Sequence, residues 1–362
     1  YRTGGFDFGG MVRYWNTYRI EDKVQNKYTY LDKEWREDIH SVGENRMERL
    51  GTQLSVNYTF NPNHSIGVRH DFTRSPDTNA NWISDDDIHR NNQLEEREHT
   101  IMGAYAQNHR HTLNAYYAGK VNGWTIDFNV DGMWYKGHES DWNNSTYQLM
   151  GHDEQTLFVN STVRNTHKLY ATKLVFTHPL AGGSLSFGGE YSYSKRTNLY
   201  TNQQGIVADD DSHSIEDIAS AFVEYGRQIG KVSLQAGVRY EHVAFDYYIQ
   251  HVYRKDLSRS TGDFFPSLAL SFPLGKVQMQ LGYAKDIQRP SFGELSGEVT
   301  YNNRYTYQTG NPLLLPMTTD NISLNAIYRW ASLSVGYQHI KNKVFYSSSP
   351  YSEEKPDVML LS

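Results

Sequence analysis

Two short acidic runs contain residue types that could hold a metal ion. Asp85-Asp86-Asp87-Ile88-His89 and Asp209-Asp210-Asp211-Ser212-His213 share the pattern Asp-Asp-Asp-x-His. Carboxylate oxygens suit calcium, and a nearby imidazole suits a softer divalent ion. Neither run has the spacing of a calcium-binding loop, and solvated acidic loop tips have the same composition. We therefore predict no metal site and keep only weak candidates: Asp85, Asp86, Asp87, His89, Asp209, Asp210, Asp211 and His213.

No catalytic motif is recognisable in the sequence. The chain of 362 residues contains no cysteine, which excludes disulfides, thiolate metal sites and cysteine nucleophiles. It contains no nucleophile elbow, no phosphate-binding glycine loop and no zinc-binding His-Glu pair. A formal net charge of -6 argues against a broad nucleic-acid surface. We predict that the protein is not an enzyme, binds no cofactor and has no nucleic-acid partner.

Alternation of apolar and polar residues predicts the elements that position the side chains. The clearest examples run over residues 232–241 and 124–135. Alternation with period two is typical of β-strands that have one apolar and one wet face. We predict that the apolar face contacts lipid through Val232, Leu234, Val238, Ile126 and Phe128. The other face would line a lumen, where Arg239 and Glu241 could reach a ligand.

The connections between these strands fall into two length classes. Short turns occur near residues 61–63, 121–123, 179–183, 229–231, 273–275 and 329–331. Long polar connections are predicted near residues 19–47, 75–97, 138–155, 200–212, 250–262 and 288–317. Short turns at one end and long loops at the other are typical of outer-membrane barrels. The sequence therefore predicts an all-β fold, a transmembrane antiparallel β-barrel, with about 13–14 strands in this chain. The alternative is a large soluble all-β protein.

A motif late in the chain resembles a known family. Arg289-Pro290-Ser291 is followed by Gly310-Asn311-Pro312 and Pro316. This stretch resembles the corresponding part of TonB-dependent outer-membrane receptors, particularly the Bacteroidetes-type outer-membrane β-barrel family. The resemblance implies localisation in the bacterial outer membrane, with membrane lipid as a partner. It also implies active uptake of a scarce solute such as a chelate, glycan or peptide.

The resemblance further implies a larger protein. Barrels of such transporters have about 22 strands and a plugged lumen. Residues 1–362 would then be one barrel domain that is truncated at both ends and lacks the plug. The TonB complex would act through that plug, so this partner is implied by the resemblance alone.

Two other functions remain open at the level of sequence. The first is a non-transporting barrel that scaffolds surface lipoproteins or envelope machinery, which would make a surface lipoprotein a partner. The second is a passive diffusion channel.

The connection at residues 288–317 is the main candidate for a binding element. Its prolines and Gly310-Asn311 restrict the backbone, so we expect an ordered loop that folds inward over the barrel mouth. Tyr301, Tyr305 and Tyr307 alternate and would share one face directed at the lumen or a ligand. The alternative is that these tyrosines pack neighbouring loops together. The cations Arg289 and Arg304 would serve an anionic solute or neighbouring acidic loops.

Overall fold

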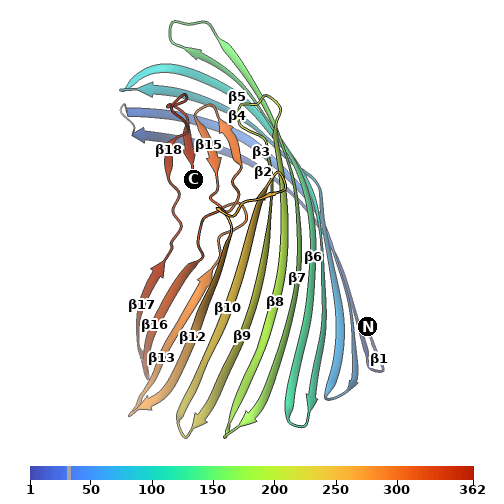
Figure 1. Cartoon of the computed structure of the whole chain (residues 1–362). Helices are drawn as coiled ribbons and strands as arrows, with labels where there is room; N and C mark the ends of the chain where they lie inside the picture. Colours follow the sequence, from blue (N-terminus) through green and yellow to red (C-terminus); the bar gives the residue numbers. More distant parts are fainter. Residues whose placement is uncertain (31–33) are drawn as a thin grey trace.

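The computed structural model describes residues 1–30 and 34–362, and it is built almost entirely of β-strands (Figure 1). No helix among these residues is long and apolar enough to cross a membrane. The strands are β1 (Arg2–Thr3), β2 (Phe6–Tyr30), β3 (Glu34–Asn61), β4 (His64–Arg90), β5 (Gln93–Val121), β6 (Trp124–Leu149), β7 (Gln155–Leu180), β8 (Gly183–Asn202), β9 (Asp210–Ile229), β10 (Val232–Ile249), β11 (Val252–Tyr253), β12 (Arg259–Leu274), β13 (Val277–Gln288), β14 (Val299–Asn303), β15 (Thr306–Thr309), β16 (Met317–Tyr328), β17 (Ala331–Lys341), β18 (Ser348–Pro350) and β19 (Met359–Leu361).

Most of these strands form one curved antiparallel wall. Its order follows the chain from β1 to β10 and continues through β12, β13, β16 and β17. Thirteen of its strands in the described part of the chain have 11 residues or more, namely β2–β10, β12, β13, β16 and β17. The prediction of an all-β antiparallel wall with about thirteen long strands is therefore confirmed.

All six predicted short turns are present, and they connect the strands at one end of the wall. The β5–β6 turn has φ angles of 49° at Asn122 and 84° at Gly123. Positive φ at both central residues defines the tight turn that matches the twist of a β-hairpin, and Asn-Gly is its preferred sequence. Ala181 and Gly182 make the same kind of turn between β7 and β8, with φ angles of 48° and 75°.

The first three predicted long connections are wrong. The strands β2–β7 continue through most of residues 19–47, 75–97 and 138–155, and a tight turn at Asn91 and Asn92 joins β4 to β5. Residues 31–33 lie outside the described residues. Polar pairs such as His99–Asp85, 2.7 Å apart, connect these extensions. Hydrophobic alternation stops there because both faces are polar, whereas the backbone ladder continues.

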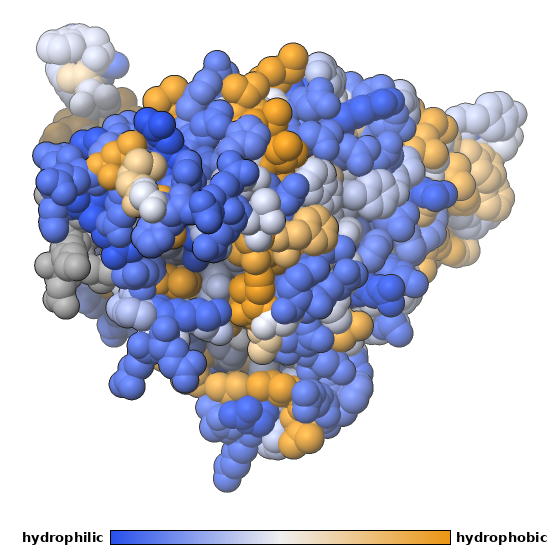
Figure 2. All heavy atoms as spheres, turned by 90° about the horizontal axis from the view of Figure 1, so that it is seen from above, coloured by the Kyte–Doolittle hydropathy of each residue, from blue (hydrophilic) through white to orange (hydrophobic). Residues whose placement is uncertain are grey.

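A second, four-stranded sheet lies on the concave side of the wall (Figure 1). Its order is β14-β15-β19-β18, and we call it the inner sheet. The far ends of β2–β5 bend over it, and Lys27 Nζ donates to Thr306 Oγ1 at 2.8 Å. Seen from above this end, the surface is mostly hydrophilic with scattered apolar patches (Figure 2).

The last strand of the chain, β19, belongs to this inner sheet and adds no fourteenth long strand to the wall. β19 pairs with β15 in parallel and with β18 in antiparallel orientation. Val358 and Met359 are 8% and 6% exposed, because they are covered by the inner sheet and its surroundings. Burial of these apolar side chains inside the molecule is favourable, whereas an edge strand of the wall would leave them exposed.

The two faces of the wall differ as the alternation predicted. Phe128 and Val238 project outward and are 39% and 38% exposed. Arg239 and Glu241, on the opposite face of β10, contact Arg289 or one another on the concave side. The outward face is therefore the apolar one, and the concave face carries the charges.

Spin labels should report this difference directly. Labels at Leu234 and Val238 in the intact protein should be accessible to oxygen dissolved in lipid, because their side chains point outward. Labels at Ser233 and Gln235 should be accessible to a water-soluble nickel chelate. Trp330, 91% exposed in the β16–β17 turn, is the water-accessible control. The same environment at odd and even positions would contradict the assignment of the two faces.

Candidate functional site

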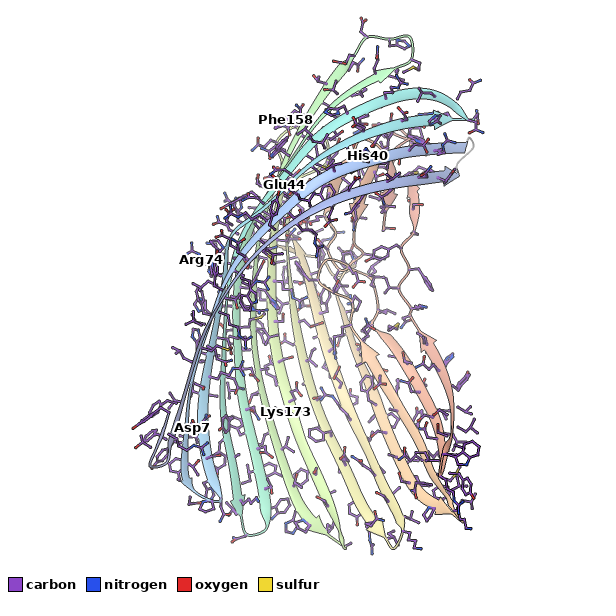
Figure 3. The ribbon with its side chains drawn as sticks, turned by 180° about the vertical axis from the view of Figure 1, so that it is seen from behind. Asp7, His40, Glu44, Arg74, Phe158 and Lys173 are labelled. Atoms are coloured by element: carbon purple, nitrogen blue, oxygen red, sulfur yellow. The ribbon has the colours of Figure 1, made fainter. Side chains whose placement is uncertain are left out.

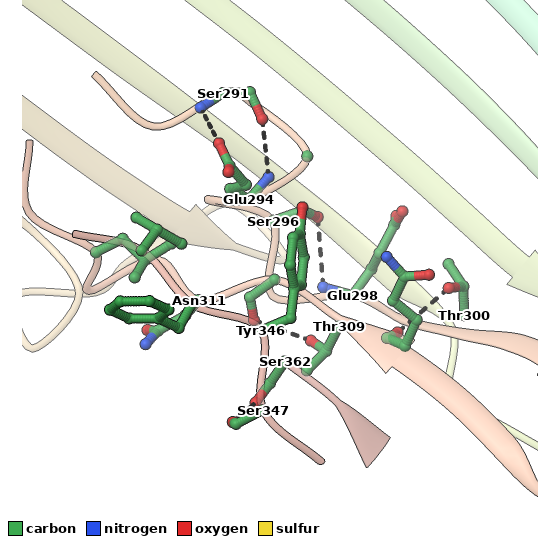
Figure 4. Close-up of a pocket in the computed structure, with 16 residues that line it drawn as sticks. Ser291, Glu294, Ser296, Glu298, Thr300, Thr309, Asn311, Tyr346, Ser347 and Ser362 are labelled. Atoms are coloured by element: carbon green, nitrogen blue, oxygen red, sulfur yellow. Dashed lines mark hydrogen bonds between the residues drawn. The ribbon is translucent and has the colours of Figure 1, made fainter. Parts of the chain in front are cut away.

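The loop at residues 288–317 folds inward, as expected, and forms two strands of the inner sheet. A compact turn precedes these strands (Figure 4). The Ser291 amide donates to the Glu294 carboxylate at 2.5 Å, and the Glu294 amide donates back to Ser291 Oγ at 3.4 Å. The Ser291 amide also lowers the pKa of Glu294, because it stabilises the ionised carboxylate. Pro290 and Pro312, which cannot donate ladder hydrogen bonds, lie in irregular backbone outside the strands.

The base of this loop is attached to the wall by an ion-pair network. Arg289 pairs with Glu241. Arg239 Nη2 lies 2.9 Å from Glu241, and its Nη1 lies 3.4 Å from Glu190 of β8. The Glu241 side chain is only 4% exposed, so the two guanidinium groups compensate a buried charge. Arg239 and Glu241 thus face the interior as predicted, and contact of either with a ligand stays a prediction.

The tip of the β14–β15 hairpin is attached to β5 by a second network. Arg304 pairs with Glu96, and its Nη1 lies 3.4 Å from Glu98. The Tyr305 hydroxyl donates to Glu96 at 2.7 Å. The Arg304 guanidinium also lies over the ring of Tyr147, 3.2 Å from its centroid. Both cations of this loop therefore pair with acidic side chains of the wall strands β10 and β5, not of neighbouring loops.

Two of the three loop tyrosines lie opposite one another in the inner sheet, and the third lies in the turn. Tyr301 and Tyr307 are opposite one another in the β14–β15 ladder and are 9% and 3% exposed. They pack in a hydrophobic cluster with Val159, Tyr200, Val207 and Val358. Tyr305 lies in the turn and contacts the Trp35 ring edge-on at 4.5 Å. Because of a register shift between Tyr301 and Asn303, alternation assigns no face to Tyr305, and contact of these tyrosines with a ligand stays a prediction.

The two Asp-Asp-Asp-x-His runs are separate in the structure and do not form a site. Asp85, Asp86, Asp87 and His89 lie within β4, not in a loop, and Asp87 pairs with Arg97 at 3.3 Å. In the second run, Asp210 and Asp211 begin β9, while Asp209 accepts from the Asn202 amide at 2.7 Å. The ring of His213 stacks on Tyr248 at 4.4 Å. In the described residues, no three acidic or histidine side chains are grouped closely enough to hold a metal ion.

Two polar cavities flank the segment at residues 293–300, and these were not predicted. The first, of about 430 Å³, lies between this segment and residues 344–347 (Figure 4). The second, of about 360 Å³, lies between the same segment and the concave face of β6, β7 and β8. Gly293, Ser296, Glu298 and Thr300 line both cavities. We call these two cavities together the mouth site.

Carboxylates and amides give the mouth site its chemical character. Glu298 accepts a hydrogen bond from Asn198, and burial raises the pKa of Glu298. Glu139 and Asp141 of β6 line the second cavity with it. The Tyr301 hydroxyl, in the same lining, has no hydrogen-bond partner within the described residues. Such a site favours a solute that donates hydrogen bonds, because its charged groups are acceptors. Sequence alone gave no indication of it, since its lining comes from distant parts of the chain.

A family match shows the class of protein to which the chain belongs. Residues 119–360 match the model of a family described as "Outer membrane protein beta-barrel family". The chain belongs to this family, which is one of outer-membrane barrel proteins and not of enzymes. No curated protein matches the chain. The predictions of the barrel fold and of outer-membrane localisation are thereby confirmed.

Solved structures show a similar fold. The copper transporter OprC has a TM-score of 0.52 at 10% identity, over 98% of this chain and 56% of that protein. The ferripyoverdine receptor of the outer membrane of Pseudomonas aeruginosa has a TM-score of 0.53 at 12% identity, over 98% of this chain and 51% of that protein. The chain thus spans just over half the length of both proteins. The resemblance to outer-membrane receptors holds for the fold, whereas the Bacteroidetes-type assignment stays a prediction.

Proposed function

We propose that this chain is the barrel part of an active outer-membrane receptor that binds a scarce solute at the mouth site and imports it. The observation that carries the proposal is the inner sheet, which the Arg289–Glu241 and Arg304–Glu96 pairs attach across the barrel mouth. A passive channel needs an open lumen, and an ion-paired sheet over the mouth favours gated uptake instead. As the resemblance implies, a plug domain elsewhere in the protein would couple the barrel to the TonB complex. None of the similar proteins named above supports a surface lipoprotein as a partner.

The chemistry of the mouth site narrows the solute class. Arg289 and Arg304 are both paired with buried glutamates, so neither cation is left for an anionic solute. Glu298, Glu139 and Asp141 would repel such a solute as well. We therefore propose a donor-rich neutral or cationic solute, with a glycan favoured over an anionic chelate.

The test is uptake by cells that express the intact protein, with three probes: an oligosaccharide, a cationic oligopeptide and an anionic ferric chelate. We expect saturable uptake of the oligosaccharide or the peptide that stops when a protonophore collapses the membrane potential. Glu298→Gln should lower affinity roughly tenfold to 100-fold, because a charge-assisted hydrogen bond is lost. Glu154→Gln, on the exposed β6–β7 turn, is the matched control and should have no effect. Uptake that persists with the protonophore would indicate a passive channel, and no uptake of any probe would indicate a scaffold.

A further inference from the structure

Four cations and a histidine form a band on the outward face of the wall. Arg74 of β4 is opposite His109 of β5, which is opposite Lys136 of β6. In the adjacent row, Lys168 of β7 is opposite Lys195 of β8. Directly opposite residues in an antiparallel sheet have Cβ atoms about 5 Å apart, so these side chains are neighbours. We call Arg74, His109, Lys136, Lys168 and Lys195 the basic band.

The basic band points away from the barrel interior. Lys136 lies on the same face of β6 as Phe128, which projects outward, because the two positions differ by an even number of residues. On β8, Lys195 is adjacent to Arg196, whose guanidinium lies over the Phe292 ring of the inward-folded loop at 5.2 Å. Successive side chains of a strand project to opposite faces, so Lys195 projects outward.

The height of the band in the wall places it at the membrane surface. The outward face of β6 is apolar from Trp124, beside the short turn, to Trp134. At about 3.3 Å per residue and a tilt near 40°, this stretch rises roughly 25 Å, the height of the apolar band of an outer-membrane barrel. Trp134 donates to the Tyr170 hydroxyl at 3.1 Å, as expected of aromatic residues at the outer interface. Lys136 is the next outward residue above Trp134, and Lys168 is opposite Trp134.

The five side chains of the basic band form no ion pair with an acidic residue. Within the described residues, none of the five takes part in an ion pair or a side-chain hydrogen bond. The nearest acid on the same face of β9 is Asp217, which accepts from Tyr191 and lies a row lower. Figure 3 shows Arg74 at the bend of the wall, between Asp7 at the short-turn end and His40 at the far end. On β4, Asp77 shares this face beyond the register shift after Ser75 and accepts a hydrogen bond from Asn79. The band therefore carries an excess of positive charge, with acidic groups only at its margins.

A groove lies within this surface. It has a volume of about 500 Å³ and is lined by Arg74, His109 and Lys136 together with Phe72, His111 and His138. The His138 Nδ1 atom is buried and has no hydrogen-bond partner among the described residues. Cationic groups around an aromatic floor suit a ligand with a phosphate head and an apolar body.

We propose that the basic band binds the phosphate groups of an anionic glycolipid in the outer leaflet of the membrane. The cations lie just above the apolar band, where the headgroups of that leaflet are located. Charge complementarity selects phosphate, because arginine and lysine form short charge-assisted hydrogen bonds to its oxygens. The acyl chains of the same lipid would lie along the apolar face below, over Trp134 and Phe128.

Native mass spectrometry of the intact protein in detergent tests the proposal, with bisphosphorylated lipid A and its dephosphorylated form as probes. We expect the wild-type protein to retain the bisphosphorylated form and to bind the dephosphorylated form much more weakly. The variant R74Q/K136Q/K168Q should bind the bisphosphorylated form about 100-fold more weakly. Millimolar inorganic phosphate should not compete, because free phosphate lacks the acyl chains. Efficient competition would assign the site to free phosphate and overturn the lipid proposal.

The matched control removes three cations from the opposite end of the barrel. K120Q/K231Q/K276Q changes the charge by the same amount at the short turns and should leave lipid binding unchanged. Equal losses in the two triple variants, or equal binding of the two lipids by wild type, would overturn the proposal. If the triple variant does not fold, Lys136→Gln alone should still weaken binding about fivefold. Unchanged binding in that folded single variant would also overturn it.

Discussion

Replacing Arg304 by glutamine should detach the tip of the β14–β15 hairpin from the wall. Glu96 and Glu98 are 2% and 6% exposed, and Arg304 is the cation that contacts both. Removing one partner of a buried ion pair costs about 3–5 kcal/mol, because an uncompensated charge stays behind. Amide hydrogen exchange of residues 299–309 in the intact protein should therefore become about 100-fold to 4,000-fold faster at neutral pH.

An exposed arginine provides the control for Arg304. Arg254 makes two hydrogen bonds to Asp256, at 2.9 Å and 2.7 Å, on the surface of the β10–β12 connection. Such exposed pairs contribute about 1 kcal/mol or less, so Arg254→Gln should leave exchange of residues 299–309 unchanged. Equal exchange rates in wild type and Arg304→Gln would show that the hydrophobic cluster alone holds the hairpin in place.

The strand alternation could be predicted from sequence wherever one face of the wall is apolar. Residues 124–135 and 232–241 were correctly predicted to be strands. Arg239 and Glu241 were also correctly predicted to point to the inner face of the wall. The same method failed at residues 75–97, because alternation reports one-sided burial and not strand formation itself. There His99 pairs with Asp85 and Arg97 with Asp87, so polar side chains continue a ladder that has no apolar face.

The site could be predicted only where local sequence restricts the backbone. The prolines and Gly310-Asn311 indicated an ordered inward loop, and the loop is ordered and inward. The contacts of this loop with the wall could not be predicted from local sequence, since Arg304 and Glu96 are 208 residues apart in the chain. Glu298 was missed for the same reason, because its hydrogen-bond donor Asn198 lies in β8, 100 residues earlier in the chain. The place of Tyr305 could not be predicted, because a register shift after Tyr301 cannot be seen in a pattern of alternate residues.

Tyr301 allows the structural and ligand-binding roles of the loop tyrosines to be separated. Its ring is part of the hydrophobic cluster between the inner sheet and the wall, so Tyr301→Ser should weaken docking of the hairpin by about 3–5 kcal/mol. Its hydroxyl is buried and has no partner within the described residues. Tyr301→Phe should therefore leave docking unchanged or strengthen it, because an unsatisfied buried hydroxyl costs about 1–3 kcal/mol.

Hydrogen exchange of residues 299–309 and solute affinity should be measured together on both variants of the intact protein. Tyr337→Ser is the control, since Tyr337 is 62% exposed on β17, outside the lining of the mouth site, and its loss should change neither exchange nor affinity. The Tyr301 hydroxyl lies in the lining of the mouth site, where a bound solute would give it a partner. Under our proposal, Tyr301→Phe lowers solute affinity roughly fivefold to tenfold while exchange stays at the wild-type rate. The opposite outcome is unchanged solute affinity in Tyr301→Phe together with weakened hairpin docking in Tyr301→Ser. It would mean that Tyr301 acts only by packing, because the ring would then be needed for docking and the hydroxyl would not be needed for solute binding.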